Sequence, residues 1–246
     1  MREEFSSKTL WLPAIIGLAI IVSTVIASMT FYSVKNSESS YLSVTGSAKK
    51  NVVSDQVKWS AQFNRRVYLS QLKSGYSQMA KDLDLVKKFY KDHGLNESDL
   101  TISPVSMDEI YDYKSDGSTS EKQYNLRQTI LVNSSDVLKI TDLAKGTQSL
   151  INQGVVFSST NLEYYYSKLP DLRVSMLSDA IKDAKARAEV IAKSGGNEIG
   201  FMKAASSGVV QVLPVNSVEV SDYGNYDTSN IEKDIMVTVR ASFTLK

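Results

Sequence analysis

The stretch that decides the fold is VSMLSDAIKDAKARAEVIAKSGG, Val174 to Gly196. Its small and apolar residues recur every three or four positions, which predicts a helix with one packing stripe. That stripe comprises Val174, Leu177, Ile181, Ala184, Ala188 and Ile191. Its alanines allow a close approach to a sheet or another helix, and the paired glycines 195–196 end the helix. We therefore interpret this helix as a packing element and not as a catalytic or nucleic-acid-binding surface.

The segments around this helix alternate between strand and helix patterns. Strands are predicted at 41–50, 55–68, 100–113, 122–133, 155–166, 200–215 and 234–245, and further helices at 69–93 and 134–154. Residues 53–166 therefore run strand, helix, strand, strand, helix, strand, which is the order of a ferredoxin-like split βαβ arrangement. The predicted class is α+β, with antiparallel sheets, packed helices, and an added helix and strands after residue 166.

Single residues support these predicted elements. The strand at 55–68 alternates through Val57, Trp59, Ala61 and Phe63, and the helix at 69–93 places Leu72, Tyr76, Met79, Leu83, Val86 and Tyr90 on one face. Gly94 follows that helix as a helix-ending glycine. Ser135 or Asp136 is the expected cap of the helix at 134–154. Asp116-Gly117 predicts a turn between two of the strands.

The composition limits the classes of function. The chain has 246 residues, of which 42% are hydrophobic, so it can form a core. Its formal net charge is +1, which gives no basic surface for nucleic acid. It has no cysteine, so disulfides, thiolate catalysis and cysteine metal sites are excluded.

The N-terminal region contains LWLPAIIGLAIIVSTVIASMTFYSV, Leu10 to Val34, without a charged residue. Such a run is long enough to cross a bilayer as a helix. It predicts an uncleaved signal anchor, because it exceeds a usual signal-peptide core. The alternative is a cleaved signal peptide, with Val25-Ile26-Ala27 before the cleavage site.

The charges flanking the run predict an orientation. Arg2, Lys8 and the amino terminus precede it, whereas only Lys35 follows closely. The positive-inside rule then gives a cytoplasmic segment 1–9, a transmembrane anchor 10–34, a tether 35–40 and an outer domain 41–246. The expected location is a bacterial cell membrane, crossed once, with the C-terminal domain in the periplasm or at the cell surface.

Two motifs carry a resemblance to a known family. The stretch DAIKDAKARAEVIAKSGGNEIGFMKAAS resembles the late signature of the SIMPL-domain family of bacterial envelope proteins, with Ala180, Ala184, Ala188, Gly196 and Gly200 matching. The stretch LSVTGSAKKNVVSDQVKWSAQF resembles the opening strand pair of the family, with Val44, Gly46, Val53 and Asp55 matching. Ser47-Ala48 stands where many relatives carry a further glycine. The resemblance spans residues 41–246 and implies an α+β fold outside the cytoplasm, with no known reaction.

We find no catalytic, cofactor or metal site in the sequence. His93 is the only histidine and stands at the end of a predicted helix, where it can cap backbone carbonyls. The candidate partner surface is Tyr164, Tyr165 and Tyr166, because tyrosine is enriched at protein interfaces. In a strand, Tyr164 and Tyr166 would share one face and Tyr165 would occupy the other.

The leading hypothesis is a membrane-anchored, extracytoplasmic protein that is not an enzyme and acts by interaction or assembly. Its partners would be the membrane, through residues 10–34, and either copies of itself or another envelope protein. The alternative is an envelope domain that binds a small ligand or senses stress.

Overall fold

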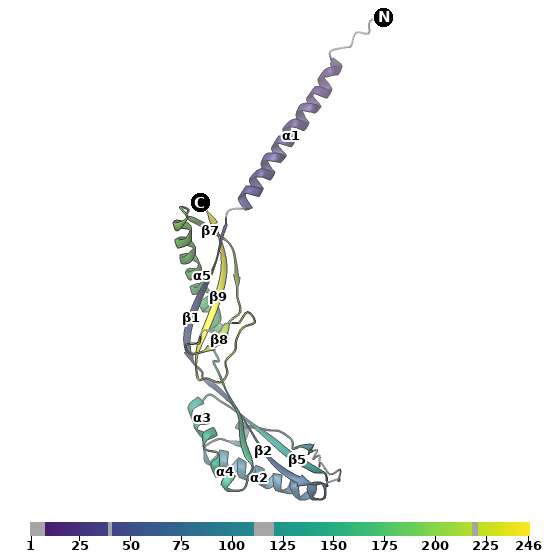
Figure 1. Ribbon diagram of the computed structural model, residues 1–246, viewed down its shortest axis with the longest axis vertical. Helices are drawn as coiled ribbons and strands as arrows, with labels where there is room; N and C mark the ends of the chain where they lie inside the picture. The colour runs from purple at the N-terminus through teal and green to yellow at the C-terminus, as the bar shows by residue number, and fades with distance from the viewer. Residues whose placement is uncertain (1–7, 39–40, 111–120, 218–220) are drawn as a thin grey trace, which may run out of the picture. The chain divides into compact units, whose positions relative to one another are not determined.

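The computed structural model describes residues 8–38, 41–110, 121–217 and 221–246 (Figure 1). The predicted turn Asp116-Gly117 lies outside these ranges. The α+β class is confirmed, because the described residues form two antiparallel sheets together with packed helices. By internal contacts the chain divides into two compact units. Unit 1 comprises Met1–Ser47, Leu177–Gly208 and Thr238–Lys246, and unit 2 comprises Ala48–Met176 and Val209–Val237.

The N-terminal helix α1 extends from Lys8 to Glu38. Within it, residues Ile15–Val34 form a segment that is long and apolar enough to cross a membrane, and none of that segment is buried. Its large apolar side chains, such as Ile21 and Phe31, are exposed. An apolar helix that no protein surface covers fits a membrane span or a signal sequence.

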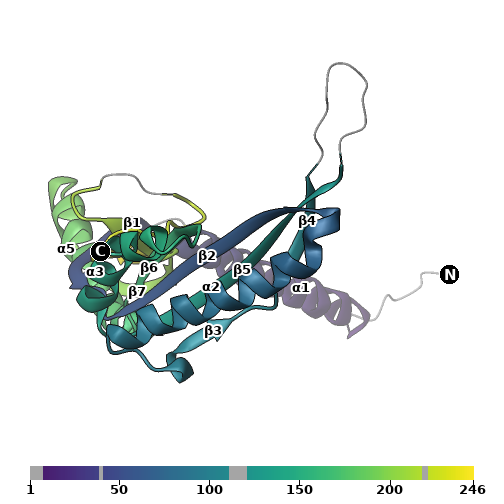
Figure 2. The ribbon, with the colours of Figure 1, turned by 90° about the horizontal axis from the view of Figure 1, so that it is seen from below.

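Unit 2 contains a five-stranded sheet with the order β3-β5-β2-β6, and β4 also pairs with β5. The strands are β2 (Gln56–Tyr68), β3 (Leu100–Ile102), β4 (Ser106–Ile110), β5 (Gln123–Ser134) and β6 (Phe157–Tyr165). All their pairings are antiparallel. Helix α2 (Leu72–Asp92) follows a short 3-10 turn and lies along one face of this sheet (Figure 2). The ferredoxin-like classification stays a prediction.

The core of unit 2 is built around Trp59. The predicted inward residues Val57, Trp59, Ala61 and Phe63 are all buried, as the alternation indicated. The Trp59 ring meets Tyr90 edge-on, with ring centres 5.3 Å apart, and meets Phe157 at 6.3 Å. Edge-to-face pairs of this kind add stability beyond the burial of their area.

The predicted apolar face of α2 is wrong at one position. Tyr76 is exposed, and Gly75 is buried in its place. A Cβ atom on Gly75 would come within 2.8 Å of the Val67 side chain, so only glycine lets the helix lie this close to β2. Asp82 is also buried. Its charge is tolerated there because both carboxylate oxygens accept hydrogen bonds from Arg65, at 2.6 and 2.8 Å.

Three predicted elements are each divided in two. The strand predicted at 100–113 becomes β3 and β4 because Pro104 lacks the N–H that a ladder requires, and its last residues, 111–113, lie outside the described ranges. The helix predicted at 134–154 becomes α3 (Val137–Lys145) and α4 (Gln148–Asn152), interrupted at Gly146, with Asp136 as the cap of α3. The strand predicted at 200–215 becomes β7 (Ile199–Ser207) and β8 (Gln211–Pro214).

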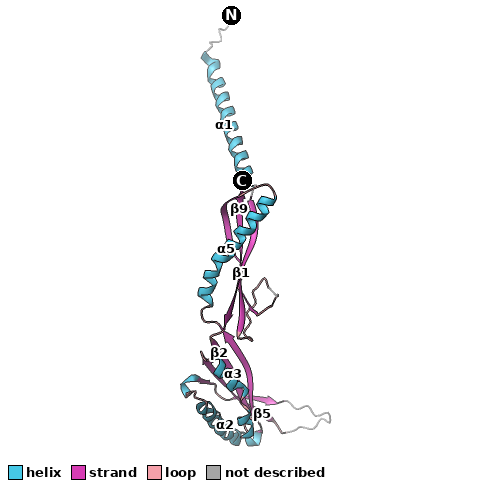
Figure 3. Cartoon of the chain, turned by 90° about the vertical axis from the view of Figure 1, so that its left-hand side faces the viewer, coloured by secondary structure: helices cyan, strands magenta, loops and turns pink. Residues whose placement is uncertain are grey.

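The second sheet has the order β1-β9-β7, and β8 also pairs with β9. Its long strands are β1 (Tyr41–Val53) and β9 (Glu232–Leu245). Helix α5 (Leu169–Ser194) runs beside β1 and β9 (Figure 3). It begins five residues earlier than predicted, with Pro170 and Asp171 in its first turn, where a proline and an acidic residue are both favourable.

The packing stripe of α5 differs from the predicted one. Val174 and Ile191 are exposed, and Leu177 and Ile181 are only partly buried. The buried positions instead recur every four residues, at Leu172, Met176, Ala180, Ala184, Ala188 and Ala192. Four residues exceed one helical turn slightly, so this stripe winds slowly around the helix. Within unit 1, Ala184 and Ala188 pack against Val44, Ala241 and Phe243.

Unit 1 depends on a backbone contact between β1 and α5. A Cβ atom on Gly46 would lie 2.2 Å from the Ala180 carbonyl oxygen and 2.3 Å from the Ala184 nitrogen. The main chain of the strand therefore lies directly against the main chain of the helix. Next to this contact, the Ser47 N–H donates to the Asp183 carboxylate at 2.7 Å, and Arg187 pairs with the same carboxylate at 2.9 Å.

We predict that Gly46→Ala lowers the free energy of unfolding by about 3 kcal/mol or more, since backbone atoms cannot move aside as side-chain ends do. The matched control is Gly195→Ala, whose Cβ would meet its nearest atom at an ordinary 3.5 Å. It should change stability by less than about 1 kcal/mol. The measurement is urea unfolding in detergent, followed by circular dichroism. Equal stability of the two variants would contradict the close approach.

Candidate functional site

Tyr164 and Tyr165 are the last residues of β6, an outer strand of the five-stranded sheet, and Tyr166 directly follows the strand. Tyr164 is buried, and its hydroxyl shares a hydrogen bond of 3.0 Å with the Thr141 hydroxyl of α3. Tyr165 and Tyr166 are half-buried. Tyr164 therefore belongs to the core, and only Tyr165 and Tyr166 can offer area to a partner. The role of the three tyrosines as a partner surface stays a prediction.

A polar loop adds a third tyrosine to this surface. The ring of Tyr226 lies 6.3 Å from the ring of Tyr165, and Tyr226 is exposed. The loop is fixed on both sides by backbone hydrogen bonds. The Tyr164 N–H donates to the Thr228 carbonyl at 2.7 Å, and the Asp227 N–H donates to the Val212 carbonyl of β8 at 2.9 Å. We call Tyr165, Tyr166 and Tyr226 the tyrosine surface.

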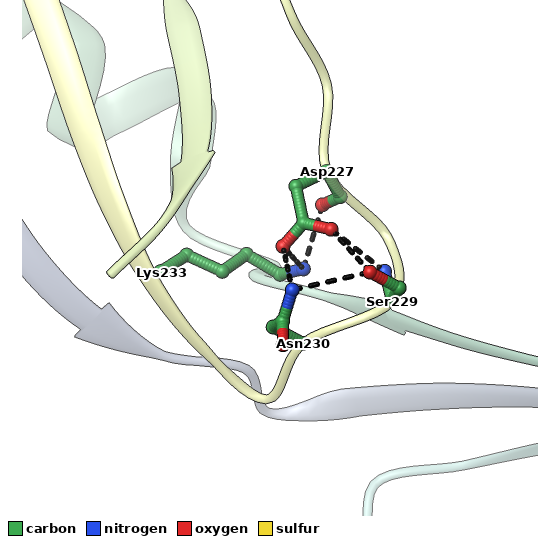
Figure 4. A network of polar contacts seen from close by, with 4 residues as sticks. All are labelled: Asp227, Ser229, Asn230 and Lys233. Atoms are coloured by element: carbon green, nitrogen blue, oxygen red, sulfur yellow. Dashed lines mark hydrogen bonds and ion pairs between the residues drawn. The ribbon is translucent and has the colours of Figure 1, made fainter. Parts of the chain in front are cut away.

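A buried lysine holds this loop from inside (Figure 4). Lys233, at the start of β9, is only 1% exposed. Its amine donates to the Asp227 carbonyl at 2.6 Å and lies 3.4 Å from the Asp227 carboxylate. The same carboxylate accepts the N–H and the hydroxyl of Ser229, and the amide of Asn230. One acidic residue thus joins the strand to the turn.

The charges in this cluster affect each other. Burial lowers the pKa of the Lys233 amine, although Asp227 opposes the change. Burial raises the pKa of Asp227, but the hydrogen bonds from Ser229 and Asn230 and the charge of Lys233 outweigh it, so the pKa is lowered overall. A buried cation needs such a partner because removing it from water is costly. The cluster therefore fixes the conformation of the loop.

A second ion pair lies beside Tyr165. The Lys58 amine is 2.9 Å from the Glu163 carboxylate, and its hydrogen bond lowers the pKa of Glu163. Burial and the nearby Glu163 raise the pKa of the Tyr165 hydroxyl. The tyrosine surface thus offers aromatic area, which is enriched at protein interfaces, beside an ion pair.

The hollow next to the loop is small. It has a volume of about 280 Å³ and is lined by Val212, Leu213, Pro214, Ser217, Asn225, Tyr226 and Asp227. Pockets for drug-sized ligands usually hold about 300–1,000 Å³. This geometry suits contact with a surface better than enclosure of a small molecule.

The sequence contains a signal for the burial of Lys233 in the alternation of β9. In β9 the buried residues Ile235, Val237, Val239, Ala241 and Phe243 alternate, and Lys233 falls in the same phase. Tyr226 could not be assigned in the same way, because a loop has no such period. His93 lies where expected, with its Nδ1 2.7 Å from the Phe89 carbonyl oxygen in the last turn of α2.

The described residues define an α+β protein with a candidate membrane span near the N-terminus. The family model of SIMPL, described as a protein of unknown function (DUF541), matches residues 42–243. The chain therefore belongs to the SIMPL family, as its motifs indicated. No curated protein matches the chain.

We predict that Lys233→Met speeds amide hydrogen exchange between Tyr223 and Ile231, since the apolar replacement keeps the length of the side chain but cannot hold Asp227. The control is Lys182→Met, which removes an exposed amine paired within α5. It should leave exchange in the loop unchanged. Hydrogen–deuterium exchange with mass spectrometry measures both. Unchanged exchange in Lys233→Met would mean that the backbone bonds alone fix the loop.

Proposed function

We propose that this protein is anchored in a bacterial cell membrane, exposes residues 41–246 outside the cytoplasm and acts by binding proteins, without catalysis. The observation that carries the proposal is the apolar segment Ile15–Val34, none of which is buried. A bilayer is the environment in which a helix of that length and composition is stable. Membership in a family of unknown function is compatible with this role and assigns no reaction.

The binding part of the proposal rests on β7. Every residue from Phe201 to Ser207 is exposed, although β7 belongs to a sheet. Within the described part of the chain, β7 is the last strand of its path and pairs only with β9. The register from Ala204 to Ser207 is regular. A free strand edge without bulges or several charges can accept a strand from another protein.

The tyrosine surface offers a second contact area, in unit 2. Its aromatic rings are held by the loop contacts described above, so little conformational freedom would be lost on binding. Copies of the same chain or another envelope protein are the proposed partners. At the tyrosine surface, the small hollow beside Tyr226 gives the ligand-binding alternative less support.

The proposed topology predicts which cysteine variants react from outside. Leu138→Cys, at an exposed position in unit 2, should react with a membrane-impermeant maleimide in intact cells. Ser6→Cys should react only after the cells are lysed. The chain has no native cysteine, so each variant reports one position. The reverse pattern, or the release of a soluble shortened chain, would overturn the anchored topology.

The proposed binding predicts crosslinks from the β7 edge. A photoreactive amino acid at Ala205 should give discrete crosslinked products in intact cells, to a partner or a second copy. The control position is Lys185, which is exposed on α5. It should give far weaker products. Equal crosslinking at both positions would argue against strand addition at β7.

A further inference from the structure

One end of unit 1 carries exposed apolar side chains beside a cation. Phe201 is 72% exposed, Tyr41 is 53% exposed and Met202 is 45% exposed. The Lys203 amine lies 5.5 Å from the centre of the Tyr41 ring. A hollow of about 540 Å³ is lined by Tyr41, Lys203, Ala204 and Ser242. We call Tyr41, Phe201, Met202 and Lys203 the β7 tip.

The local backbone makes the β7 tip a poor site for strand addition. The pairing of β7 with β9 shifts register between Ile199 and Met202 and again between Met202 and Ala204. Such irregularities bend a strand and interrupt its row of free backbone groups. The regular ladder begins only at Ala204. The exposed apolar side chains therefore lie where another strand fits least well.

Chain length places the β7 tip close to the bilayer. Tyr41 is the first residue of β1, and α1 ends at Glu38, four residues after the apolar segment ends at Val34. The path from Val34 to Tyr41 is at most about 16 Å, from the helical rise and the extended reach of the chain. Lipid headgroups occupy about the first 5–8 Å beyond the hydrocarbon core. The tether thus keeps Tyr41 within about 10 Å of the headgroups.

We infer that the β7 tip rests on the membrane–water interface at the outer face of the bilayer that α1 crosses. Phe201 and Met202 lie among the lipid headgroups, and Lys203 lies near lipid phosphates. This inference depends on the proposed membrane anchoring. Aromatic side chains favour the interfacial layer, and a lysine can extend its amine toward anionic headgroups while its stem remains in apolar surroundings. The contact would fix one end of unit 1 against the bilayer from which α1 emerges.

The test uses the full chain, reconstituted in vesicles of phosphatidylcholine with a minority of phosphatidylglycerol. Because the chain has no cysteine, single spin labels can be attached at Met202→Cys, Ser207→Cys and Val22→Cys. Residue 207 is the matched control, since it is exposed on the same strand, about 16 Å further along. The measurement is the collision rate of each label with a water-soluble nickel chelate and with oxygen, which concentrates in the bilayer.

We expect the label at 22 to be shielded from nickel, and the label at 202 to collide with nickel several-fold less often than the label at 207. Adding Phe201→Asp to the variant labelled at 202 should remove that difference. Vesicles of phosphatidylcholine alone should reduce it, because Lys203 then lacks anionic headgroups. Circular dichroism would verify that Phe201→Asp keeps the fold, as expected for an exposed side chain.

Two results would overturn the inference in different ways. Equal nickel collision at 202 and 207, with the label at 22 shielded, would leave the anchoring intact and reject contact at the β7 tip. Nickel access to the label at 22 would instead reject the membrane span, and with it both proposals.

Discussion

The close approach of Gly46 to the backbone of α5 is the constraint on which unit 1 depends. A strand and a helix can meet main chain to main chain only if both lack bulk at the contact, which is why Gly46 faces Ala180 and Ala184. Because alanine side chains are short, this face of α5 contacts only the strands directly beneath it. Ala184 and Ala188 contact residues of β1 and β9, whereas β7 stays exposed from Phe201 onward. The same packing that fixes the sheet therefore leaves one strand available.

Unit 2 uses the opposite solution, a core of large side chains with a few buried charges. Trp59, Phe63 and Tyr90 are fully buried, and such aromatics supply most of the area that a small core needs. Asp82 and Lys233 are buried as well, each with an opposite charge or a carbonyl within reach. Because removing one partner would leave an uncompensated charge, these pairs restrict the chain to one arrangement at those points.

Much of the fold could be predicted because its patterns are local. The alternation in β2 and the glycine after α2 need no knowledge of the rest of the chain. Prediction failed where tertiary contacts decide. The spacing of apolar and small residues in α5 is compatible with several packing stripes. Only the close approach of Gly46 selects the stripe of alanines. Tyr76 has the character of a core residue, but the space at that turn of α2 suits Gly75. Tyr165 and Tyr166 could be named from the sequence, but Tyr226 could not, because it reaches Tyr165 only through the hydrogen bonds of its loop.

Anchoring changes how strong a surface contact must be. A patch of a few side chains such as the β7 tip would bind a bilayer weakly if the domain diffused freely. In the proposed anchored chain, a tether of a few residues would make that contact intramolecular. The β7 tip would then meet the bilayer at a high effective concentration, so a weak intrinsic affinity would be enough. Insertion of α1 as proposed would already cost the entropy of positioning, so a modest apolar area would suffice to orient unit 1. Under the proposed anchoring, the attachment point of β1 would determine which end of the sheet faces lipid, and the regular edge at Ala204–Ser207 would stay free for the proposed protein partner.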